Sequence, residues 1–535
     1  MAAIPYKQAQ LADAWDAIVI GSGIGGLTTA VLLALHAHKR VLVLERHYEV
    51  GGFTHTFRRP GYEWDVGLHY VGEMQRDGRV RRAFDHVTGG QVHWQPMPEV
   101  YDRFLFPGRT VSLAAGRFRE SLLEAFPNEP VAIDKYIAAV QASNRASTLY
   151  YAEKALPGPI AMLAGGMMRA PAMRWARRTT LEVLQGLTSN AELIGVLTAQ
   201  WGDYGLPPAQ SSFAVHATIA EHYFSGASYP AGGASTIATA MLPQIEQAGG
   251  TGVTAAEVAS ILLDARGRAC GVRMADGREF RAPLVFSDAG AANTFGRLLP
   301  PDLPALASLR TQLRALDPST AHITLYAGLS QPDAALGLTG TNMWVYPSFD
   351  HDANVARFAR DFDHDPDAPF PGVYLSFPSA KNPSFAQRHP GRATVEAIAM
   401  LPYAAFAAYA GTRWKRRPTD YDAIKQHLSA RLLAELQRQV PAVAGNVAHA
   451  ELSTPLTTQH FMNYGHGEIY GVAATPARYA VRALGARTPI RGLYLTGADV
   501  ASLGIVGALF GGVLSASAAL GKNLVSAVSK PATSN

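Results

Sequence analysis

The sequence predicts an α/β fold with two domains: a Rossmann-like parallel sheet, and a discontinuous second domain built on a mixed or antiparallel sheet plus helices. Three observations predict this fold. A strand, a glycine-rich turn and a helix open the chain, a strand and a glycine-rich helix close it, and a further run of helix and strand patterns lies between two long intervals. Because 535 residues can bury a large core, two domains are the expected arrangement.

The composition is that of a globular protein, and it narrows the classes of partner. Hydrophobic residues make up 48% and charged residues 17%, which is too apolar for a disordered chain. The net charge of +5 would suit an anionic membrane surface or a nucleic acid. No motif of interleaved basic and aromatic residues is present, so we expect no nucleic-acid partner. With one cysteine and no histidines at metal-ligand spacing, we expect no intrachain disulfide and no metal site.

A strand, a glycine-rich turn and a helix follow one another over residues 16–37. The turn reads Gly21-Ser-Gly23-Ile-Gly25-Gly26. Its first glycine permits the tight turn, the second lets the backbone approach a pyrophosphate, and the last lets the helix pack close to the strand. The amino terminus of the helix then offers free N–H groups to the phosphates. The unit therefore predicts a dinucleotide site.

A second strand pattern, residues 40–44, ends in Glu45. An acidic residue at this distance from the glycine turn is placed to accept hydrogen bonds from the ribose of an adenosine. The alternative is a glycine-rich turn that only packs against its neighbours and binds no dinucleotide. The presence of both strands, the turn and the acid makes this alternative a poor one.

Residues 46–56 resemble the paired-glycine extension of the glutathione-reductase-type flavoproteins. The resemblance implies that Gly51 and Gly52 pass the backbone beneath the ribityl chain of FAD, and that Arg46 and Thr54 also contact the cofactor. A plain NAD domain does not need this extension. The expected fold is therefore a glutathione-reductase-type two-domain FAD-binding fold, with FAD held non-covalently.

The carboxyl-terminal part supplies the complement of this site. Residues 491–499 form a strand and a turn that contains Gly497 and Asp499, and residues 504–520 form an apolar helix. The same resemblance implies that Asp499 binds the ribityl chain or its phosphate. It also implies that the start of the helix, with Gly504, Val506 and Gly507, points at the flavin pyrimidine. Two alternatives stay open: Asp499 is a helix cap, or the helix is a membrane span, although it is shorter than the roughly 20 residues required.

The middle of the chain returns to this domain with a helix over residues 234–248, a hairpin near residues 258–274 and a strand over residues 283–287. In relatives, the backbone near Val258 meets the adenine. The expected FAD-binding domain comprises residues 13–75, 225–300 and 485–525. The expected substrate domain comprises residues 76–224 and 301–484, and residues 526–535 are expected to be a disordered tail.

Several motifs spread over nearly the whole chain resemble one family, the retinol saturases within the phytoene desaturase and carotenoid isomerase group. They include His69-Tyr70-Val-Gly72 and Asp203-Tyr-Gly-Leu-Pro-Pro208, together with residues 222–233, 377–383, 390–392, 454–457 and 496–507. The resemblance implies an FAD-dependent oxidoreductase that exchanges a hydride between flavin N5 and a carbon of a hydrophobic polyene or unsaturated lipid. No second strand, GxGxxG turn and helix unit appears, so the electron donor or acceptor stays open.

His69, Tyr70 and His222 are the candidate catalytic residues, because each could pass a proton near the flavin. His216 and Glu221 are weaker candidates, and for each of these side chains a packing role is the alternative. A carotenoid or phytoene desaturase, or a cis-trans isomerase, is the alternative function on the same scaffold. A non-catalytic lipid-binding escort protein is the alternative of another class, but the intact glycine turn argues against it.

Residues 157–178 combine apolar and basic side chains and are expected to touch a membrane surface. The contributing residues are Ile160, Met162, Leu163, Met167, Met168, Met173 and Trp175 with Arg169, Arg174, Arg177 and Arg178. Pro171 is expected to interrupt any continuous helix. A buried helix pair with a basic edge is the alternative. Because no signal peptide is recognisable, we expect a cytoplasmic protein that is peripheral to the membrane.

Overall fold

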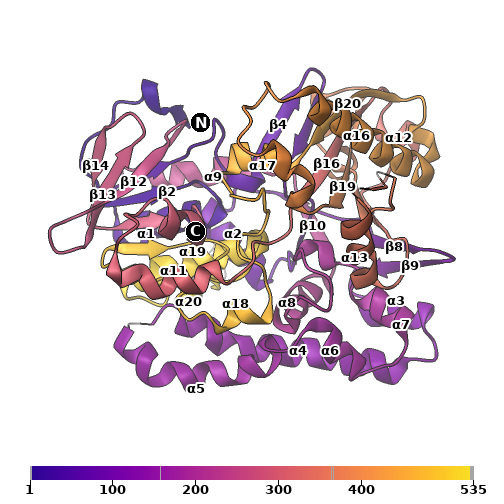
Figure 1. Cartoon of the computed structure of the whole chain (residues 1–535), viewed down its shortest axis with the longest axis horizontal. Helices are drawn as coiled ribbons and strands as arrows, with labels where there is room; N and C mark the ends of the chain where they lie inside the picture. The colour runs from indigo at the N-terminus through magenta and orange to yellow at the C-terminus, as the bar shows by residue number, and fades with distance from the viewer. Residues whose placement is uncertain (1–2, 157, 363, 366, 531–535) are drawn as a thin grey trace.

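Two sheets organise the chain, one on each side of Figure 1. The structure, a computed structural model, describes residues 3–156, 158–362, 364–365 and 367–530. The first sheet has six strands in the order β1, β11, β3, β2, β15, β21, and all neighbours are parallel. These strands are β1 (Ile4–Pro5), β2 (Ala17–Ile20), β3 (Val41–Leu44), β11 (Thr251–Thr254), β15 (Val285–Ser287) and β21 (Leu493–Leu495). Three distant parts of the chain therefore form one parallel sheet.

Both faces of this sheet are covered, and the alternation of side chains along each strand explains how. In β2, Ala17 and Val19 pack with helices α1 (Ile24–Ala37), α9 (Ser235–Glu246) and α19 (Gly504–Leu520). Ile18 and Ile20 point to the other face and pack with a three-stranded antiparallel sheet. Its strands are β12 (Val258–Leu263), β13 (Ala269–Met274) and β14 (Glu279–Arg281). Apolar residues at every strand position are what a sheet buried on both faces requires.

The second sheet has seven strands, and it confirms the expected mixed sheet. Its order is β20, β16, β19, β18, β17, β8, β9, with antiparallel neighbours except for the parallel pair β17 and β8. Helix α16 (Thr419–Gln439) packs on it through Leu428, Leu432 and Leu436, spaced four residues apart. The strands are β8 (Val100–Phe106), β9 (Arg109–Ala114), β16 (His322–Leu329), β17 (Asn342–Val345), β18 (Val373–Ser376), β19 (Ala393–Met400) and β20 (Val447–Ser453).

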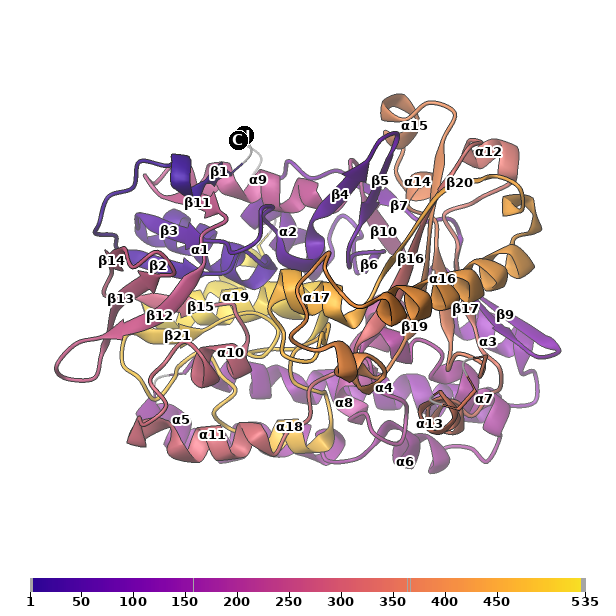
Figure 2. The ribbon, with the colours of Figure 1, turned by 45° about the horizontal axis from the view of Figure 1, so that its top comes forward.

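A helical layer lies along one side of the molecule, at the lower edge of Figures 1 and 2. It contains α4 (Pro130–Glu153), α5 (Gly158–Ala176), α6 (Thr180–Gln185) and α8 (Phe213–Tyr223). Helix α4 packs on both α5 and α8. Small sheets join the two domains: the hairpin β4 (Thr56–Arg59) and β5 (Tyr62–Asp65), and the antiparallel group β6 (Val71–Gly72), β10 (Ala227–Pro230) and β7 (Trp94–Pro96).

Two sequence-based expectations are wrong. Helix α5 continues through Pro171. Pro171 lies on the exposed side of the helix, where water can bind the carbonyl that lost its partner. Residues 526–528 are not part of a disordered tail, because they end helix α20 (Leu524–Val528), and Val528 is fully buried in the core beside α2 (Arg79–Thr88). The last part of the predicted tail, residues 531–535, lies outside the described residues.

The apolar helix near the carboxyl terminus packs inside the protein. Helix α19 lies against α1, and its central residues from Gly511 to Ala518 are buried. None of the helices in the described part of the chain combines the length and the hydropathy needed to cross a membrane. The small residues of α19 instead let it approach α1 closely: a Cβ on Gly512 would lie 2.7 Å from Cβ of Thr28.

Candidate active site at the junction of two cavities

The glycine-rich turn between β2 and α1 forms an open cradle at the carboxyl edge of the parallel sheet. Gly21 has a φ of +94°, in the left-handed region that favours glycine. A Cβ on Gly25 would lie 2.6 Å from the backbone nitrogen of Gly497, and one on Gly52 would lie 3.0 Å from Cα of Gly23. The N-cap residue of α1, Gly23, has no side chain, although the backbone N–H groups of Gly23 and Gly26 bond the Asp288 carboxyl group. The cradle therefore has the shape that a pyrophosphate requires.

Glu45, at the end of β3, holds the cradle in shape. Its Oε2 accepts hydrogen bonds from the backbone N–H (2.8 Å) and the hydroxyl (2.6 Å) of Ser22, and its Oε1 accepts one from the backbone N–H of His47 (2.7 Å). The Ser22 hydroxyl in turn accepts from the backbone N–H of Gly51 (3.1 Å). Glu45, the residue predicted to bind the ribose, thus links the glycine turn to the paired-glycine segment.

A first cavity, of about 280 Å³, runs along this cradle. Most of the predicted cofactor-binding residues line it: Gly21, Gly23, Gly25, Glu45, Arg46, Gly51, Gly52, Thr54, Val258 and Gly504. Five predicted residues do not. Gly26 and Gly497 lie behind the cradle beside the Asp288 side chain, and Val506 and Gly507 face a second cavity. The sequence thus located the cavity but not the direction in which every residue points.

Asp499, the fifth of these residues, is buried and already has protein partners. Its Oδ2 accepts from the backbone N–H of Ala291 (2.8 Å), at the start of α10 (Ala291–Gly296), and its Oδ1 accepts from the backbone N–H of Val472 (3.2 Å). Arg478 lies 3.8 Å away. Asp499 therefore caps α10, which agrees with the alternative of a cap, although the capped helix is not α19. Its contact with a cofactor stays a prediction.

Asp288 is a cavity residue that the sequence reasoning missed. It follows β15, and its side chain lies against the glycine turn, with Oδ2 3.1 Å from the position that a Cβ on Gly26 would take. Burial raises the pKa of Asp288 to about 8, while the backbone N–H groups of Gly26 and Gly23 act in the opposite direction. The signal was available: β15 pairs with β2, so its carboxyl end must reach the same edge as the glycine turn.

A second cavity, of about 650 Å³, meets the first one. Its walls come mainly from α4, α8 and the first turns of α19, and its volume lies within the range of cavities that hold small ligands. Six residues line both cavities and define the junction: Gly67, His69, Asp203, Tyr470, Gly504 and Ile505. A ligand in one cavity can therefore touch a ligand in the other.

His69 is at the junction, as its candidate role requires. Its Nδ1 lies 2.9 Å from Oε2 of Glu396, which belongs to β19 and has no exposed surface. Burial lowers the pKa of His69 to about 3 and raises the pKa of Glu396 to about 8. Near neutral pH the pair therefore carries its proton on the carboxyl group beside a neutral imidazole.

Tyr70 lines the second cavity and belongs to a buried polar network. Its hydroxyl oxygen lies 3.1 Å from Oδ2 of Asp102 and 3.1 Å from Oδ2 of Asp203. Its ring stacks on Tyr223 with 4.4 Å between the centroids. Burial, followed by the charges of the two aspartates, raises the pKa of Tyr70, so the hydroxyl stays protonated.

The remaining histidine candidates are engaged with the protein. Nε2 of His222 accepts from the backbone N–H of Gly72 (2.8 Å), and His222 faces the second cavity away from the junction. His216 bonds to the hydroxyls of Tyr136 (2.9 Å) and Tyr204 (3.1 Å) and lines neither cavity. Across the described ranges, no group of His, Cys, Asp or Glu side chains is placed to hold a metal ion.

Three further buried charges near the junction were also missed. Lys381 donates to the backbone carbonyl of His69 (3.1 Å) and to Oγ of Ser376 (2.7 Å), and burial lowers its pKa to about 7. Glu396 and Asp102 are the other two. Lys381 belongs to the segment 377–383, which the sequence singled out by resemblance, but nothing in that segment indicates that it folds against His69.

The fold and the site define the class: an oxidoreductase with a Rossmann-type dinucleotide site and a second domain that closes over it. A family model described as an NAD(P)-binding Rossmann-like domain matches residues 19–87. The chain is 35% identical over 525 residues to the all-trans-retinol 13,14-reductase of Danio rerio, covering 95% of this chain and 86% of the relative. It belongs to the all-trans-retinol 13,14-reductase family, the retinol saturases.

A more distant relative and a solved structure complete the comparison. The chloroplastic prolycopene isomerase of Arabidopsis thaliana is 26% identical over 527 residues, covering 94% of this chain and 82% of the relative. An oxidoreductase from Methanosarcina mazei has a TM-score of 0.61 at 18% identity, covering 93% of this chain and 98% of that chain. At this identity the structural likeness concerns the fold alone, and it confirms the expected two-domain α/β fold.

Proposed function

We propose that the chain binds FAD in the first cavity and saturates one carbon–carbon double bond of a long apolar polyene in the second. All-trans-retinol is the first candidate substrate, because the relatives at about 35% identity are named for the reduction of its 13,14 bond. The observation that carries the proposal is the junction, where His69, Asp203 and Gly504 line both cavities. A reaction between two bound ligands requires such a shared wall.

The first cavity fits FAD in its shape. The glycine turn leaves room that any Cβ would fill, and it leads into the amino terminus of α1, the kind of helix end at which phosphates bind. Arg46 and Val258 line the part of the first cavity next to Glu45. We propose that the adenosine binds there. Bound reduced FAD would supply a hydride to the substrate. The protein orients the two ligands and keeps water away.

The second cavity fits a long apolar substrate. Leu68, Ile219, Phe510 and Leu514 contribute its apolar walls, while polar side chains such as Arg79 and Lys522 line other parts of it. A polyene has no polar group at the carbons that react, so its position must come from the shape of an apolar cavity. Saturation also consumes one proton, and acidic groups stand at the junction: the His69 and Glu396 pair, and Asp203 beside Tyr70.

Cis-trans isomerisation is the second candidate function, favoured by the likeness to the prolycopene isomerase of Arabidopsis thaliana. The same two cavities would serve it, since the isomerase reaction needs an ordered polyene beside the cofactor. Desaturation would use the same geometry in the opposite direction. A non-catalytic lipid carrier has less support, because the cradle keeps every glycine that a cofactor requires.

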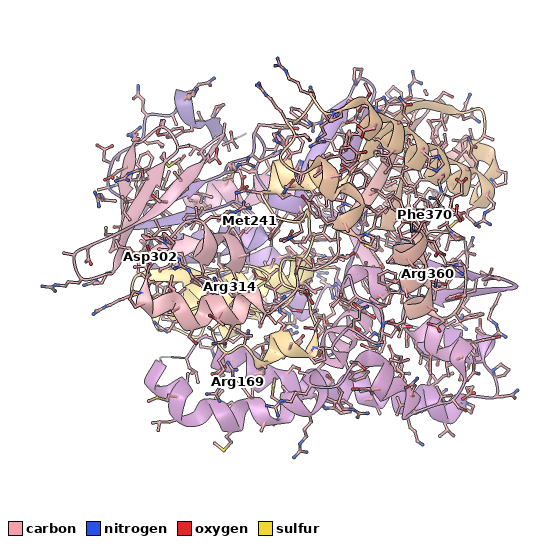
Figure 3. All side chains as sticks on the ribbon, in the orientation of Figure 1. Arg169, Met241, Asp302, Arg314, Arg360 and Phe370 are labelled. Atoms are coloured by element: carbon pink, nitrogen blue, oxygen red, sulfur yellow. The ribbon has the colours of Figure 1, made fainter. Side chains whose placement is uncertain are left out.

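A membrane surface is the proposed partner, contacted by α5. Met162, Leu163 and Met167 are 76%, 85% and 77% exposed. Leu163 and Met167 lie on the other side of the helix from buried Arg169, which donates from Nε to buried Glu153 of α4 (2.9 Å), and Figure 3 shows Arg169 where α5 faces the molecule. This ion pair holds one side of α5 against the protein, so the apolar side chains face outward. Farther along the chain, the exposed Arg174, Arg177 and Arg178 would attract anionic lipid.

This surface lies beside the second cavity. Tyr151 and Ala152 at the end of α4, and Ala155 and Leu156 just after it, line the cavity, and α5 begins two residues later at Gly158. We place the entrance for a substrate that resides in the bilayer at this corner, so that it would leave the lipid without crossing water.

Anaerobic single turnover tests the function. The purified protein is loaded with FAD, reduced with dithionite and mixed with all-trans-retinol, other retinoids or carotenoids, and the products are weighed by mass spectrometry. A gain of two mass units with reoxidation of the flavin supports saturation, and no change of mass with altered geometry supports isomerisation. In a parallel sample left oxidised, a loss of two mass units with reduction of the flavin supports desaturation. A protein that binds no flavin overturns the proposal.

A further inference from the structure

The hydrogen bonds around Tyr70 require that one of two neighbouring carboxyl groups, Asp102 or Asp203, carries a proton. The Tyr70 hydroxyl has one hydrogen, yet its oxygen lies at hydrogen-bond distance from carboxylate oxygens of both Asp102 and Asp203 (3.1 Å each). If both aspartates were ionised, one contact would set a lone pair against a lone pair in a buried site. A proton on one of the two carboxyl groups removes this conflict.

The partners decide which aspartate carries the proton. Asp102 has no exposed surface and accepts from Nε2 of Gln200 (2.8 Å) and from Nδ2 of Asn342 (3.0 Å). With the Tyr70 hydroxyl as a third donor, its negative charge is well solvated by the protein. The carboxyl group of Asp203 bonds to the Tyr70 hydroxyl. The arrangement that satisfies every group runs from Asp203 O–H to the Tyr70 oxygen, and from Tyr70 O–H to Asp102.

Asp203 also occupies the place where a proton is needed. It ends the short 3-10 helix Trp201–Asp203, whose Trp201 is buried in the core, and its own side chain stays partly open to the junction of the two cavities. Asp102 lies behind Tyr70 and lines neither cavity. Burial, with the charge of Asp102 as the next cause, raises the pKa of Asp203 to about 8.

The titratable groups around Asp203 come from every neighbouring element. They are Tyr70, Asp102 of β8, Tyr204, Tyr223 of α8, Tyr346, Tyr374 of β18, Lys381 of α14 (Pro378–Lys381) and Tyr470. Lys381 is the one cation of this set, and it opposes the shift only partly. The surroundings therefore favour a neutral carboxyl group at Asp203.

We propose that Asp203 is the catalytic acid of the saturation reaction, with Tyr70 and Asp102 positioning it. This inference rests on the proposed function. The π bond of the substrate breaks; one of its carbons forms a C–H bond with the hydride that reduced FAD supplies, and the neighbouring carbon forms a C–H bond with the proton of Asp203. The substrate gains two electrons and two hydrogens, the flavin is oxidised, and Asp203 is left as a carboxylate that recovers its proton from water.

The His69 and Glu396 pair is the rival donor, and the geometry is less favourable to it. The acidic proton of that pair belongs to Glu396, which has no exposed surface and stands behind the imidazole. The part that reaches the junction is a neutral imidazole, a far weaker acid than a carboxyl group. His69 is better placed to orient a ligand than to protonate it.

The test compares Asp203→Asn with Glu396→Gln under single turnover of the dithionite-reduced, FAD-loaded protein with all-trans-retinol. For the unaltered protein, the rate of flavin reoxidation is expected to be flat at low pH and to fall as the pH rises through about 8, because the acid must be protonated. Asp203→Asn is expected to lower the rate by about a hundredfold or more and to abolish this pH dependence. Glu396→Gln is expected to keep the pH dependence.

A spectroscopic readout on the same samples separates loss of the acid from loss of the fold. Infrared difference spectra between pH 7 and pH 9 should contain protonated-carboxyl bands of Asp203, Glu396 and Asp288, of which Asp203→Asn removes one, while flavin absorbance and retinol binding are retained. The inference is overturned if Asp203→Asn keeps the rate within about threefold, or if Glu396→Gln flattens the pH profile instead. It is also overturned if the unaltered protein shows no pH dependence up to pH 9, a measurement that requires no variant. If the unaltered protein forms no product of any kind, the proposed function fails instead.

Discussion

Asp288 is the residue whose charge should affect cofactor binding most directly. Its carboxyl group lies against the glycine turn, beside Gly23 and Gly26, where we propose that the pyrophosphate of FAD binds. A neutral carboxyl group can share this space with phosphates, but an ionised one repels them. Because the pKa of Asp288 is raised to about 8, its charge appears as the pH rises through that value.

We therefore expect FAD to bind more weakly as the pH rises above about 8. The Asp288→Asn variant should bind FAD at least as tightly at neutral pH and should lose this dependence, whereas the unaltered protein should lose up to about tenfold in affinity per pH unit. Titration of flavin fluorescence between pH 6 and pH 9 measures both slopes.

Asp264→Asn is the matched control, since Asp264 is an exposed carboxylate in the turn of the β12 and β13 hairpin. It should keep the slope of the unaltered protein. Equal slopes for the Asp288 variant and the unaltered protein would refute the role given to Asp288.

At this scale the sequence predicted backbone requirements better than buried charges. Gly21, Gly51 and Gly52 were found because the local turn demands them, and all three have positive φ. Asp203 and Glu396 could not be found in this way, because the burial that raises their pKa values, and for Asp203 also the charge of Asp102, comes from segments far away in the chain. The shift in their pKa exists only after these segments meet.

Helix α1 offers a sharp test of the cradle, because another helix carries a matched glycine. In Gly25→Ala the new methyl group would meet the backbone of Gly497 at 2.6 Å, so we expect the variant to lose most FAD binding. Gly166→Ala in α5 has nothing within 4 Å of the new Cβ. It should bind FAD normally and stabilise its helix by up to about 1 kcal/mol.

Flavin content after purification and circular dichroism of the folded state distinguish the two variants. A Gly25→Ala protein that retains full flavin would show that the close approach of α1 and the β21 turn is not required for binding.

Helix α5 is the element whose outer face should determine membrane binding. Replacing Leu163 and Met167 together by Glu removes two apolar side chains and adds negative charge, so we expect vesicle binding to fall by at least about tenfold. Co-sedimentation with vesicles that contain anionic lipid measures the loss. Val131→Glu, at an equally apolar and 64% exposed position on α4, is the control and should bind as before. Equal binding by the double variant and the control would remove α5 from the interface.

At the scale of elements, helices with strong end signals were predicted well. The helix over residues 504–520 was predicted with the bounds that α19 has. Prediction failed where tertiary contacts override local signals. Pro171 does not break α5, because buried Arg169, Ala172 and Ala176 hold both sides of the proline against the protein. Residues 526–528 are helical because Val528 fits a gap beside α2.

The whole molecule should gain stability from its cofactor, because the first cavity is lined by residues from both ends and from the middle of the chain. A ligand that binds only the folded state adds stability in proportion to the logarithm of its concentration, about 4 kcal/mol at a thousandfold excess over Kd. We expect added FAD to raise the midpoint of thermal unfolding by several degrees. Gly25→Ala should show no such rise. A midpoint that FAD leaves unchanged in the unaltered protein would contradict the site.

The assembly of the parallel sheet from three distant segments was predictable because each segment repeats one pattern, a short apolar strand next to glycine. The order of strands and the pairing of β8 with β17 were not predictable, since these strands are separated by more than 200 residues and carry no register signal. Strand β1, ahead of the first predicted segment, was missed because two residues give no periodicity.

The contact between α1 and α19 has a consequence for folding during synthesis. The two helices are separated by almost the entire polypeptide, so on a ribosome that adds about 5–20 residues per second, α1 waits roughly 25 to 90 seconds for its partner. During that time its apolar flank is open to other chains. Nascent protein should thus depend on chaperones early, and truncation before residue 504 should leave a product that aggregates before it can take up a cofactor.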